Sequence, residues 1–211
     1  MKRLALIGSK EFAEQIQGFA EATGQFVVVG YFDDYEEKGT IIRSLPVLGG
    51  INDIESEYQK GLFDCVFLAA GYNNFIFREN TFNKLSPTVP FANILSPSAT
   101  IGKNVIIGQG VFVGDHTYID DKSIIEDNVF IHVGSTIGHN NIIGAHTYIS
   151  GRFDTCGDVK VGKRCFIGVR CLVSDHVSIC DDSWIGIGSV VLKNITEPGK
   201  YMPISRLIRV E

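Results

Sequence analysis

Five histidines are the side chains of this chain best suited to proton transfer near neutral pH, because imidazole gains and loses a proton there without help from its surroundings. They are His116, His132, His139, His146 and His176. Each could serve as a general base, and each could equally be a solvent-exposed side chain without a role. His132, His139 and His146 are seven residues apart, a spacing that separates them on a short structural repeat. No metal site is therefore predicted.

Polar residues also follow three apolar runs in the first ninety residues, at 8–10, 33–34 and 71–73. A glycine between a strand and a helix can bring backbone N–H groups and the helix amino terminus toward a phosphate. Paired aspartates can accept hydrogen bonds from a ribose or a base. A complete G-x-G-x-x-G motif is absent, so a capped helix and a polar turn remain the alternative interpretation. The candidate ligand-binding residues here are Gly8, Ser9, Lys10, Asp33, Asp34, Gly71 and Asn73.

The elements that must position these loops alternate between strand and helix. The expected strands are 3–7, 26–32, 47–48 and 64–70, and the expected helices are 10–22, 52–60 and 74–85. This alternation predicts a small parallel α/β sheet. The carboxyl ends of parallel strands meet at one edge, so the polar loops are expected to lie close together.

From Leu95 to Thr196 the chain repeats every six residues, seventeen times without an insertion. The first position is aliphatic in sixteen of the seventeen hexads, and Thr155 is the exception. The fifth position is small or slim in fifteen hexads, and glycine fills the second position in eight. A period of six fits neither a helix nor a long strand, but it fits a short strand followed by a corner.

Three such hexads make one triangular coil of eighteen residues. The aliphatic first position points into the coil and stacks on its equivalent in the next coil, so Ile101 is expected near Ile119. Stacked coils form a parallel β-helix. The same register places Gly157 next to His139, because both occupy the third position of hexads one coil apart.

Composition excludes several classes of function. The chain has 211 residues and a formal net charge of −5, which gives no support to a nucleic-acid-binding surface. Its five cysteines are odd in number and show no paired spacing, so a reducing, cytoplasmic setting is expected. The opening M-K-R-L-A-L-I-G has only a brief apolar run and is interpreted as a strand rather than a signal peptide. No stretch has the length of a membrane span.

The hexad pattern, aliphatic-Gly-x-x-small-x, resembles the hexapeptide acyltransferases, whose β-helix is left-handed. The whole chain resembles a group of bacterial sugar acetyltransferases: the sialic acid O-acetyltransferases, the UDP-4-amino-sugar N-acetyltransferases of the bacillosamine pathway and the perosamine N-acetyltransferases. The matching motifs are G-Y-F-D-D at 30–34, A-G-Y-N-N at 70–74 and N-I-L-S-P-S-A-T-I-G at 93–102. The resemblance implies a Rossmann-like nucleotide-sugar-binding domain at 1–92. It also implies a left-handed β-helix acyltransferase domain with a C-terminal cap at 93–211.

The resemblance implies catalytic roles as well. The segment I-G-H-N-N-I at 137–142 matches the stretch that carries the general base, here His139. Gly157 would then present its N–H to the thioester carbonyl. Asn140 stands where an acidic residue is usual, and Tyr148 stands where a second histidine is usual. The implied coenzyme A contacts are Tyr148, Gly157, Gly168, Gly186 and Ile187.

In that family the first domain holds the nucleotide of a nucleotide-sugar. This implies substrate roles for Gly8, Ser9, Lys10, Asp33, Asp34, Gly71, Asn73 and Arg78. The family places coenzyme A between neighbouring prisms, so a homotrimer is expected. The resulting hypothesis is an acetyl-CoA-dependent N-acetyltransferase acting on a nucleotide-linked 4-amino-4,6-dideoxy sugar. Two alternatives stay open: a sugar O-acetyltransferase of the sialic acid type, and a non-catalytic β-helix binding protein. The nucleotide also stays open between UDP, GDP and dTDP.

Overall fold

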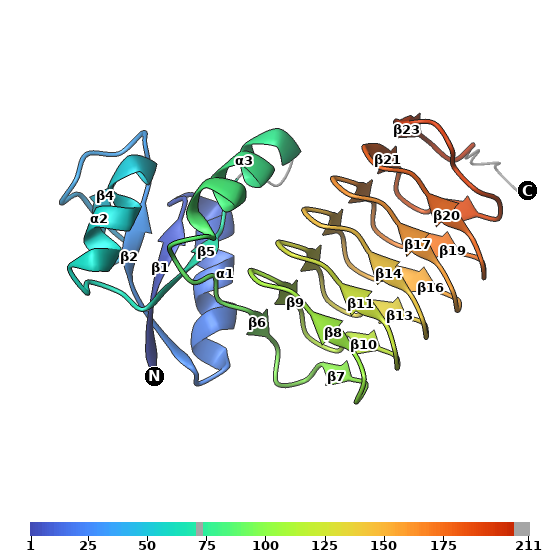
Figure 1. Ribbon diagram of the computed structural model, residues 1–211, viewed down its shortest axis with the longest axis horizontal. Coiled ribbons are helices and arrows are strands. Elements are labelled where there is room, and N and C mark those ends of the chain that lie inside the picture. Colours follow the sequence, from blue (N-terminus) through green and yellow to red (C-terminus); the bar gives the residue numbers. More distant parts are fainter. Residues whose placement is uncertain (71–73, 205–211) are drawn as a thin grey trace, which may run out of the picture.

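The computed structural model describes residues 1–70 and 74–204. Figure 1 shows a small α/β domain followed by a long stack of coils that extends away from it. The α/β elements are β1 (Lys2–Ile7), α1 (Glu11–Ala22), β2 (Phe26–Phe32), β3 (Ile41–Ile42), β4 (Leu45–Gly49), a 3-10 turn (Ile51–Asp53), α2 (Ile54–Gln59), β5 (Cys65–Leu68) and α3 (Phe75–Leu85). The predicted strands and helices are confirmed within a few residues. The short strand β3 was not predicted.

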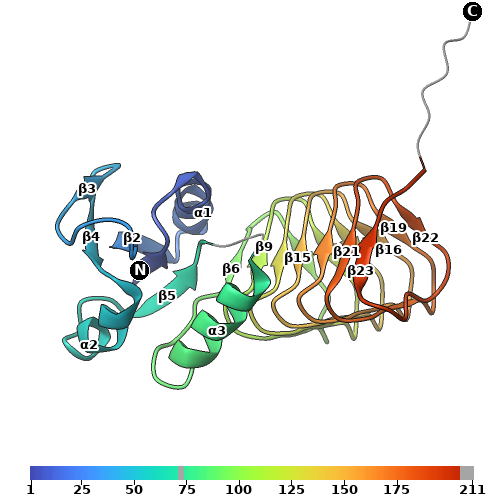
Figure 2. The same cartoon turned by 90° about the horizontal axis from the view of Figure 1, so that it is seen from above.

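The α/β sheet has the strand order β3-β4-β2-β1-β5, and all its pairs are parallel except β3 with β4. Alternating side chains of β1 point to opposite faces. Leu4 and Leu6 pack against α1, whereas Ala5 and Ile7 belong to the cluster with α2 and α3. Figure 2 shows α1 on one side of this sheet and α2 and α3 on the other. The sheet therefore has helices on both faces, and its strand ends remain available for a site.

The coils form a prism of three parallel sheets. The first sheet contains β6 (Ile94–Leu95), β9 (Phe112–Val113), β12 (Phe130–Ile131), β15 (Tyr148–Ile149), β18 (Phe166–Ile167), β21 (Ser183–Ile185) and β23 (Gly199–Tyr201). The second contains β7 (Thr100–Ile101), β10 (Tyr118–Ile119), β13 (Thr136–Ile137), β16 (Asp154–Thr155), β19 (Leu172–Val173) and β22 (Val190–Val191). The third contains β8 (Ile106–Ile107), β11 (Ile124–Ile125), β14 (Ile142–Ile143), β17 (Lys160–Val161) and β20 (Ser178–Ile179). This is the predicted architecture, an α/β domain followed by a hexapeptide-repeat β-helix.

The predicted register of eighteen residues is confirmed as far as Val191, whereas Ile195, in the last predicted hexad, pairs with Ile179, sixteen residues back. Ile119 pairs with Ile101 on one side and with Ile137 on the other. In these coils the first-position side chains, from Ile119 to Ile137, are completely buried and form one apolar column along the prism axis. Each such side chain stabilises the fold by about 1.5–3 kcal/mol relative to exposure. The fourth position of the hexad takes the left-handed backbone conformation, as at Asn140 (φ 57°) and Asp158 (φ 59°), and this conformation makes the corner.

An aromatic ladder joins the two domains. It consists of the outward side chains of the first sheet, which stack one coil apart: Phe112, Phe130, Tyr148, Phe166 and Trp184. Helix α1 lays Phe19 and Phe12 against the lower rungs, with ring centroids 5.0 Å and 5.2 Å from Phe112 and Phe130. The α/β domain therefore packs against one face of the prism through apolar contacts.

A buried polar contact joins the domains beside this ladder. Nη2 of Arg78, from α3, donates to the side-chain oxygen of Asn128 at 2.7 Å. The amide nitrogen of Asn128 lies 3.0 Å from Nδ1 of His146. An amide nitrogen can only donate, so Nδ1 of His146 accepts and the imidazole is neutral in this arrangement. Burial lowers the pKa of His146, and burial also lowers the pKa of His132.

These pKa shifts predict that stability falls in mild acid. A histidine whose folded-state pKa lies below its ordinary value of about 6.5 takes up its proton more readily in the unfolded chain. His146, which is buried, and His132, which is half-buried, therefore cost no stability above about pH 7 and destabilise the fold as the pH drops below their ordinary pKa. We expect the midpoint of thermal unfolding to fall by roughly a few degrees between pH 7.5 and 5.5.

The substitution His146→Asn should flatten this pH dependence. The matched control is His116→Asn, because His116 is exposed and has the same left-handed corner conformation (φ 55°, against 63° for His146). An unfolding midpoint that is level across this pH range in the unsubstituted protein would contradict the prediction.

Candidate functional site

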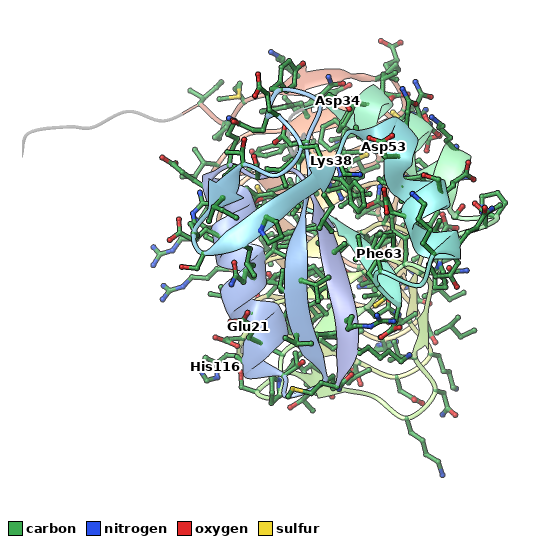
Figure 3. All side chains as sticks on the ribbon, turned by 90° about the vertical axis from the view of Figure 1, so that its left-hand side faces the viewer. Glu21, Asp34, Lys38, Asp53, Phe63 and His116 are labelled. Carbon is green, nitrogen blue, oxygen red and sulfur yellow. The ribbon has the colours of Figure 1, made fainter. Side chains whose placement is uncertain are left out.

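The first candidate site is a pocket of about 800 Å³ at the carboxyl ends of β1 and β2. It is lined by the predicted residues Gly8, Ser9, Lys10, Asp33 and Asp34. Figure 3 shows Asp34 and Asp53 at this end of the sheet, whereas Glu21 lies at the opposite end. Gly71 and Asn73, also predicted, lie outside the described residues. The structure therefore gathers two of the three predicted polar loops around one cavity.

Asp33 organises this pocket from within. One carboxylate oxygen accepts hydrogen bonds from the backbone N–H of Ser9 at 3.0 Å and from its hydroxyl at 2.6 Å. The other oxygen accepts from the N–H of Tyr35 at 3.0 Å. Gly8 has a φ of 104°, and a Cβ there would lie 2.7 Å from the side chain of Ala70, so only glycine fits this turn. Asp33 thus fixes the loop at 8–10. Because both of its carboxylate oxygens already accept hydrogen bonds from the protein, it is better placed to hold this loop than to bind a ligand.

The charged groups on the pocket wall differ from the predicted set. Lys10 is exposed and forms an ion pair with Glu36. Arg43, which the sequence analysis missed, donates to the carbonyl of Ser9 at 2.9 Å and pairs with Glu14 at 2.9 Å. Among the described lining residues, Lys10 and Arg43 are the cations. Arg43 reaches the pocket from the turn between β3 and β4, which carries no recognisable motif.

The structure does not support the predicted substrate role of Arg78. Its side chain is 1% exposed and is not part of the pocket wall. The guanidinium donates to the carbonyls of Leu68 and Ala70 and to Asn128 across the domain boundary. Burial lowers the pKa of its guanidinium to about 10. Arg78 therefore joins the end of β5 and helix α3 to the prism.

Tyr148 is also placed differently from the prediction. Its ring is a buried rung of the aromatic ladder, 4.8 Å from Phe130 and 6.3 Å from Phe12 between ring centroids. It belongs to the first sheet, whereas His139 lies in the corner between the second and third sheets. The position gives Tyr148 a packing role between the domains, and we do not include it in the second candidate site.

The second candidate site is the corner that carries His139, between β13 and β14. A Cβ on Gly157, one coil along, would lie 2.5 Å from Nε2 of this imidazole. The ring therefore lies against a bare stretch of main chain, as the register predicts. Within the described residues, the N–H of Gly157 has no hydrogen-bond acceptor. The imidazole itself is exposed in a single chain.

A carboxylate that the sequence analysis missed reaches this imidazole through Asn140. The amide nitrogen of Asn140 lies 3.2 Å from Nδ1 of His139 and 3.2 Å from a carboxylate oxygen of Asp158. Asp158 is the stack-mate of Asn140, eighteen residues along the chain, so the register could have revealed the pair. The amide orients the ring, and the charge of Asp158 lies one side chain further out.

The other predicted coenzyme contacts lie at a different corner. Gly168 and Ile187 follow strands of the first sheet, and the backbone of Ile187 lies 2.6 Å from where a Cβ of Gly168 would be. Gly186 is covered by Met202 and Pro203 of the C-terminal segment. One chain therefore does not bring these residues to His139.

The described part of the chain contains neither a group of metal ligands nor a membrane-spanning helix. Within 1–70 and 74–204, no three histidine, cysteine, aspartate or glutamate side chains are grouped as they would be around a metal ion. None of the helices in the described part of the chain is long and apolar enough to cross a membrane.

Comparison with known proteins gives matches in both domains. The family model described as the PglD N-terminal domain matches residues 3–85, and the model described as the hexapeptide repeat of succinyl-transferase matches residues 158–193. The curated UDP-3-O-acylglucosamine N-acyltransferase from Bordetella avium is 43% identical over 65 residues, which are 31% of this chain and 18% of that protein. The chain thus spans about a fifth of the length of the curated relatives that it matches.

Solved structures match the whole chain in fold. A mutant of perosamine N-acetyltransferase from Caulobacter crescentus, in complex with CoA and GDP-perosamine, is similar with a TM-score of 0.88 and 24% identity, covering 100% of this chain and 98% of that one. The acetyltransferase domain of PglB from Neisseria gonorrhoeae has a TM-score of 0.85 and 24% identity, covering 96% and 97%. WeeI from Acinetobacter baumannii has a TM-score of 0.77 and 20% identity, covering 92% and 93%.

These matches confirm the predicted resemblance. The part of the chain ahead of the β-helix matches the PglD N-terminal domain model, and part of the β-helix matches a hexapeptide-repeat model. The fold of the chain is that of the perosamine N-acetyltransferase and the PglB acetyltransferase domain to which it is similar.

Gly157→Ala tests the contact between His139 and the main chain. The added methyl group would lie 2.5 Å from Nε2 and 3.1 Å from Nδ1, so the imidazole must move. We expect the turnover of whatever reaction uses this ring to fall by about 10²-fold, since a displacement of 1 Å can cost that much. The matched control is Gly151→Ala, a third-position glycine at another corner, whose Cβ would meet one carbonyl at 3.2 Å. Equal turnover in the two variants would contradict the prediction.

Proposed function

We propose that the protein is an acetyl-CoA-dependent N-acetyltransferase that acts on the amino group of a nucleotide-linked 4-amino-4,6-dideoxy sugar. The observation that carries this proposal is the imidazole of His139 held against the bare main chain of Gly157. The pocket in the α/β domain supports a nucleotide-bearing substrate. The similar fold of a perosamine N-acetyltransferase crystallised with CoA and GDP-perosamine supports the same class of reaction.

The chemistry assigned to this corner is direct acyl transfer. The sugar amine, in its neutral form, attacks the thioester carbonyl of acetyl-CoA and forms the new C–N bond. His139 takes the proton that the nitrogen loses, and the C–S bond breaks to release coenzyme A, which leaves as the thiol once that proton is returned. The N–H of Gly157 donates to the carbonyl oxygen as it gains negative charge. Its N–H is suited to this role because it has no acceptor among the described residues.

The tautomer of His139 decides whether it can accept that proton at Nε2. With the amide nitrogen of Asn140 on Nδ1, the neutral ring carries its hydrogen on Nε2. A half turn of the amide places its oxygen on Nδ1 instead, and Nε2 is then free to accept. Asp158 favours the first arrangement, because its carboxylate holds the amide nitrogen. The reaction as proposed therefore includes this half turn, and the contact with Asp158 sets its cost.

The pocket of the α/β domain suits a nucleoside diphosphate. Its floor is the turn at 8–10 and the amino terminus of the twelve-residue helix α1, which attract phosphate oxygens. Arg43 and Lys10 are the cations of this wall, and a phosphate would compete for them with their present partners Glu14 and Glu36. The carboxylate of Asp34 is exposed and holds the N–H of Ile51 with one oxygen at 2.7 Å, which leaves the other oxygen for a ribose hydroxyl or a base N–H.

A second and third copy of the chain would complete the acetyl-CoA site, as the expected homotrimer requires. The corner with Gly168 and Ile187 would then face the His139 corner of a neighbour. Outward side chains of the second sheet support this assembly, because Leu172 and Val190 are apolar yet 42% and 59% exposed. Apolar side chains grouped on an exposed surface typically mark a protein contact.

The expected effect of His139→Asn is a fall in kcat of about 10²–10⁴, the usual contribution of a general base. The assay measures thiol release from acetyl-CoA in the presence of a nucleotide-linked 4-amino sugar. His116→Asn serves as the control, since His116 is an exposed histidine at another corner. Turnover of His139→Asn within a few fold of the unsubstituted enzyme would remove the imidazole from the mechanism.

The same assay separates the rival functions. A hydroxy analogue of the sugar that is acetylated faster than the amine would establish the O-acetyltransferase alternative. Failure to bind coenzyme A in calorimetry would favour the non-catalytic binding protein.

Arg43→Asn should weaken nucleotide binding by about tenfold, because one charge-assisted contact to a phosphate is lost. Asparagine tolerates the left-handed conformation of this residue (φ 47°). Calorimetry with UDP, GDP and dTDP measures the effect and also identifies the preferred nucleotide. The control is Lys2→Ala, at the opposite end of β1. Unchanged affinity in Arg43→Asn for the nucleotide that binds would place the phosphates elsewhere.

A further inference from the structure

A buried polar pair interrupts the apolar column of the prism next to His139. Thr155 is the one first-position residue that is not aliphatic, and it is 7% exposed. Asn141, at the inward fifth position of the His139 hexad, is completely buried. Its amide nitrogen donates to the hydroxyl oxygen of Thr155. A buried polar pair in an aliphatic column costs stability unless each of its polar atoms has a hydrogen-bond partner. The partners of Thr155 and Asn141 therefore show which part of the main chain the pair holds in place.

The pair changes the backbone ladder of the second sheet at one place. In the neighbouring coils, the N–H of the second hexad position donates to the carbonyl of the first position one coil on, as Asp120 does to Ile137 and Cys156 to Val173. Gly138 instead donates to the side-chain oxygen of Thr155 at 2.9 Å. Strands β13 and β16 accordingly pair only at Thr136 and Asp154. The main chain after Thr155 is thus released from the regular ladder on the side of β13, while Cys156 keeps its regular hydrogen bond to Val173 on the other side.

Asn141 holds the released segment at both ends. Its amide nitrogen donates to the carbonyl of Cys156 at 3.1 Å, and its oxygen accepts from the N–H of Val159 at 2.7 Å. Gly157 and Asp158 lie between these two contacts. Gly157 packs against the imidazole of His139, and Asp158 contacts Asn140. One buried side chain, two residues after His139, therefore fixes the segment that faces His139.

We propose that Thr155 and Asn141 are positioning residues for the acyl-transfer site. They set the main chain of Cys156–Gly157 at a fixed distance from His139, so that the N–H of Gly157 faces the acyl carbonyl. This inference rests on the proposed function and adds to it the source of the site's geometry. Two aliphatic side chains could fill the same space in the column. We therefore attribute the hydrogen bonds of the polar pair to the placement of the turn that contains Gly157 and Asp158.

The test replaces the pair by apolar residues of similar size, as the double substitution Thr155→Val with Asn141→Val. Valine already occupies the inward fifth position at Val159 and Val177. The double variant removes the side-chain partners of the N–H groups of Gly138 and Val159 and of the carbonyl of Cys156, so these groups must find backbone partners. Cooperative unfolding within about ten degrees of the unsubstituted protein shows that the fold is kept. The kcat of the double variant should fall about 10- to 100-fold, with the KM for the nucleotide sugar unchanged within twofold, because the binding pocket lies in the other domain.

Two further variants separate positioning from packing. Thr155→Ser keeps the hydroxyl and should keep kcat within about threefold of the unsubstituted enzyme. Thr147→Val removes another buried hydroxyl, which contacts the carbonyl of Gly162 at another corner, and should leave kcat unchanged. A double variant that keeps full turnover, or a Thr147→Val variant that loses as much, would overturn the proposal.

A crystal structure of the double variant gives a readout that does not depend on activity. We expect the nitrogen of Gly157 to move relative to the ring of His139, and not to move in Thr155→Ser. An unmoved main chain would overturn the positioning role even if turnover fell. If the unsubstituted protein acetylates no nucleotide-linked sugar, the proposed function fails, and the displacement still decides whether the pair positions the turn.

Discussion

The register of eighteen residues per coil is the constraint on which the rest of the prism depends. Backbone hydrogen bonds and the apolar column both require that each residue lies on the one eighteen positions away, and the strand pairs keep this spacing from Leu95 to Val191. A coil one residue longer would rotate every following side chain relative to the first. The same rule creates the candidate active corner, because Gly157 is the stack-mate of His139 and Asp158 that of Asn140.

The domain contact places the nucleotide pocket relative to this register. Helix α1 begins at the pocket and packs its aromatic side chains on the ladder of the first sheet. Helix α3 anchors Arg78 in the prism, at Asn128. Because both helices also pack against the α/β sheet, a shift of the domain would expose apolar rings and leave a buried guanidinium without acceptors. Exposing the rings or leaving the guanidinium without acceptors would cost free energy, and this cost fixes the orientation of the α/β domain on the prism.

Much of the fold could be predicted because it follows from local periodicity. The hexads determine strand length, corners and stacking, and the alternating apolar runs determine the α/β sheet. The same reasoning failed for residues whose role comes from a partner distant in sequence. Arg78 has the spacing of a surface helix residue, and its partner Asn128 is fifty positions away. Tyr148 stacks between Phe130 and Phe166 as the register requires, but its contact with Phe12 of the other domain could not be predicted from the period. Arg43 reaches the pocket from a hairpin too short to show a period.

The candidate site illustrates the same division. The contact between His139 and Gly157 follows from the register and could be predicted. The link from His139 through Asn140 to Asp158 follows from the same register, but it requires the side chain of a corner residue to point along the stack. The roles of Thr155 and Asn141 depend on a local change in backbone hydrogen bonding that no periodicity describes. In the sequence, Thr155 is visible only as an exception to the aliphatic pattern.

Exposure of the imidazole makes the assembly part of the proposed chemistry. In one chain, His139 lies on a convex corner in contact with water, and a convex surface neither encloses a thioester nor strengthens a single N–H donor. Water at that corner would also compete with the amine for the acyl group. A neighbouring prism laid against the apolar side chains of the second sheet would supply the missing wall, exclude water and strengthen the hydrogen bond from Gly157. A neighbouring prism that buried Leu172 and Val190 would also enclose His139. The proposed assembly therefore explains both the exposed apolar side chains and the exposed imidazole.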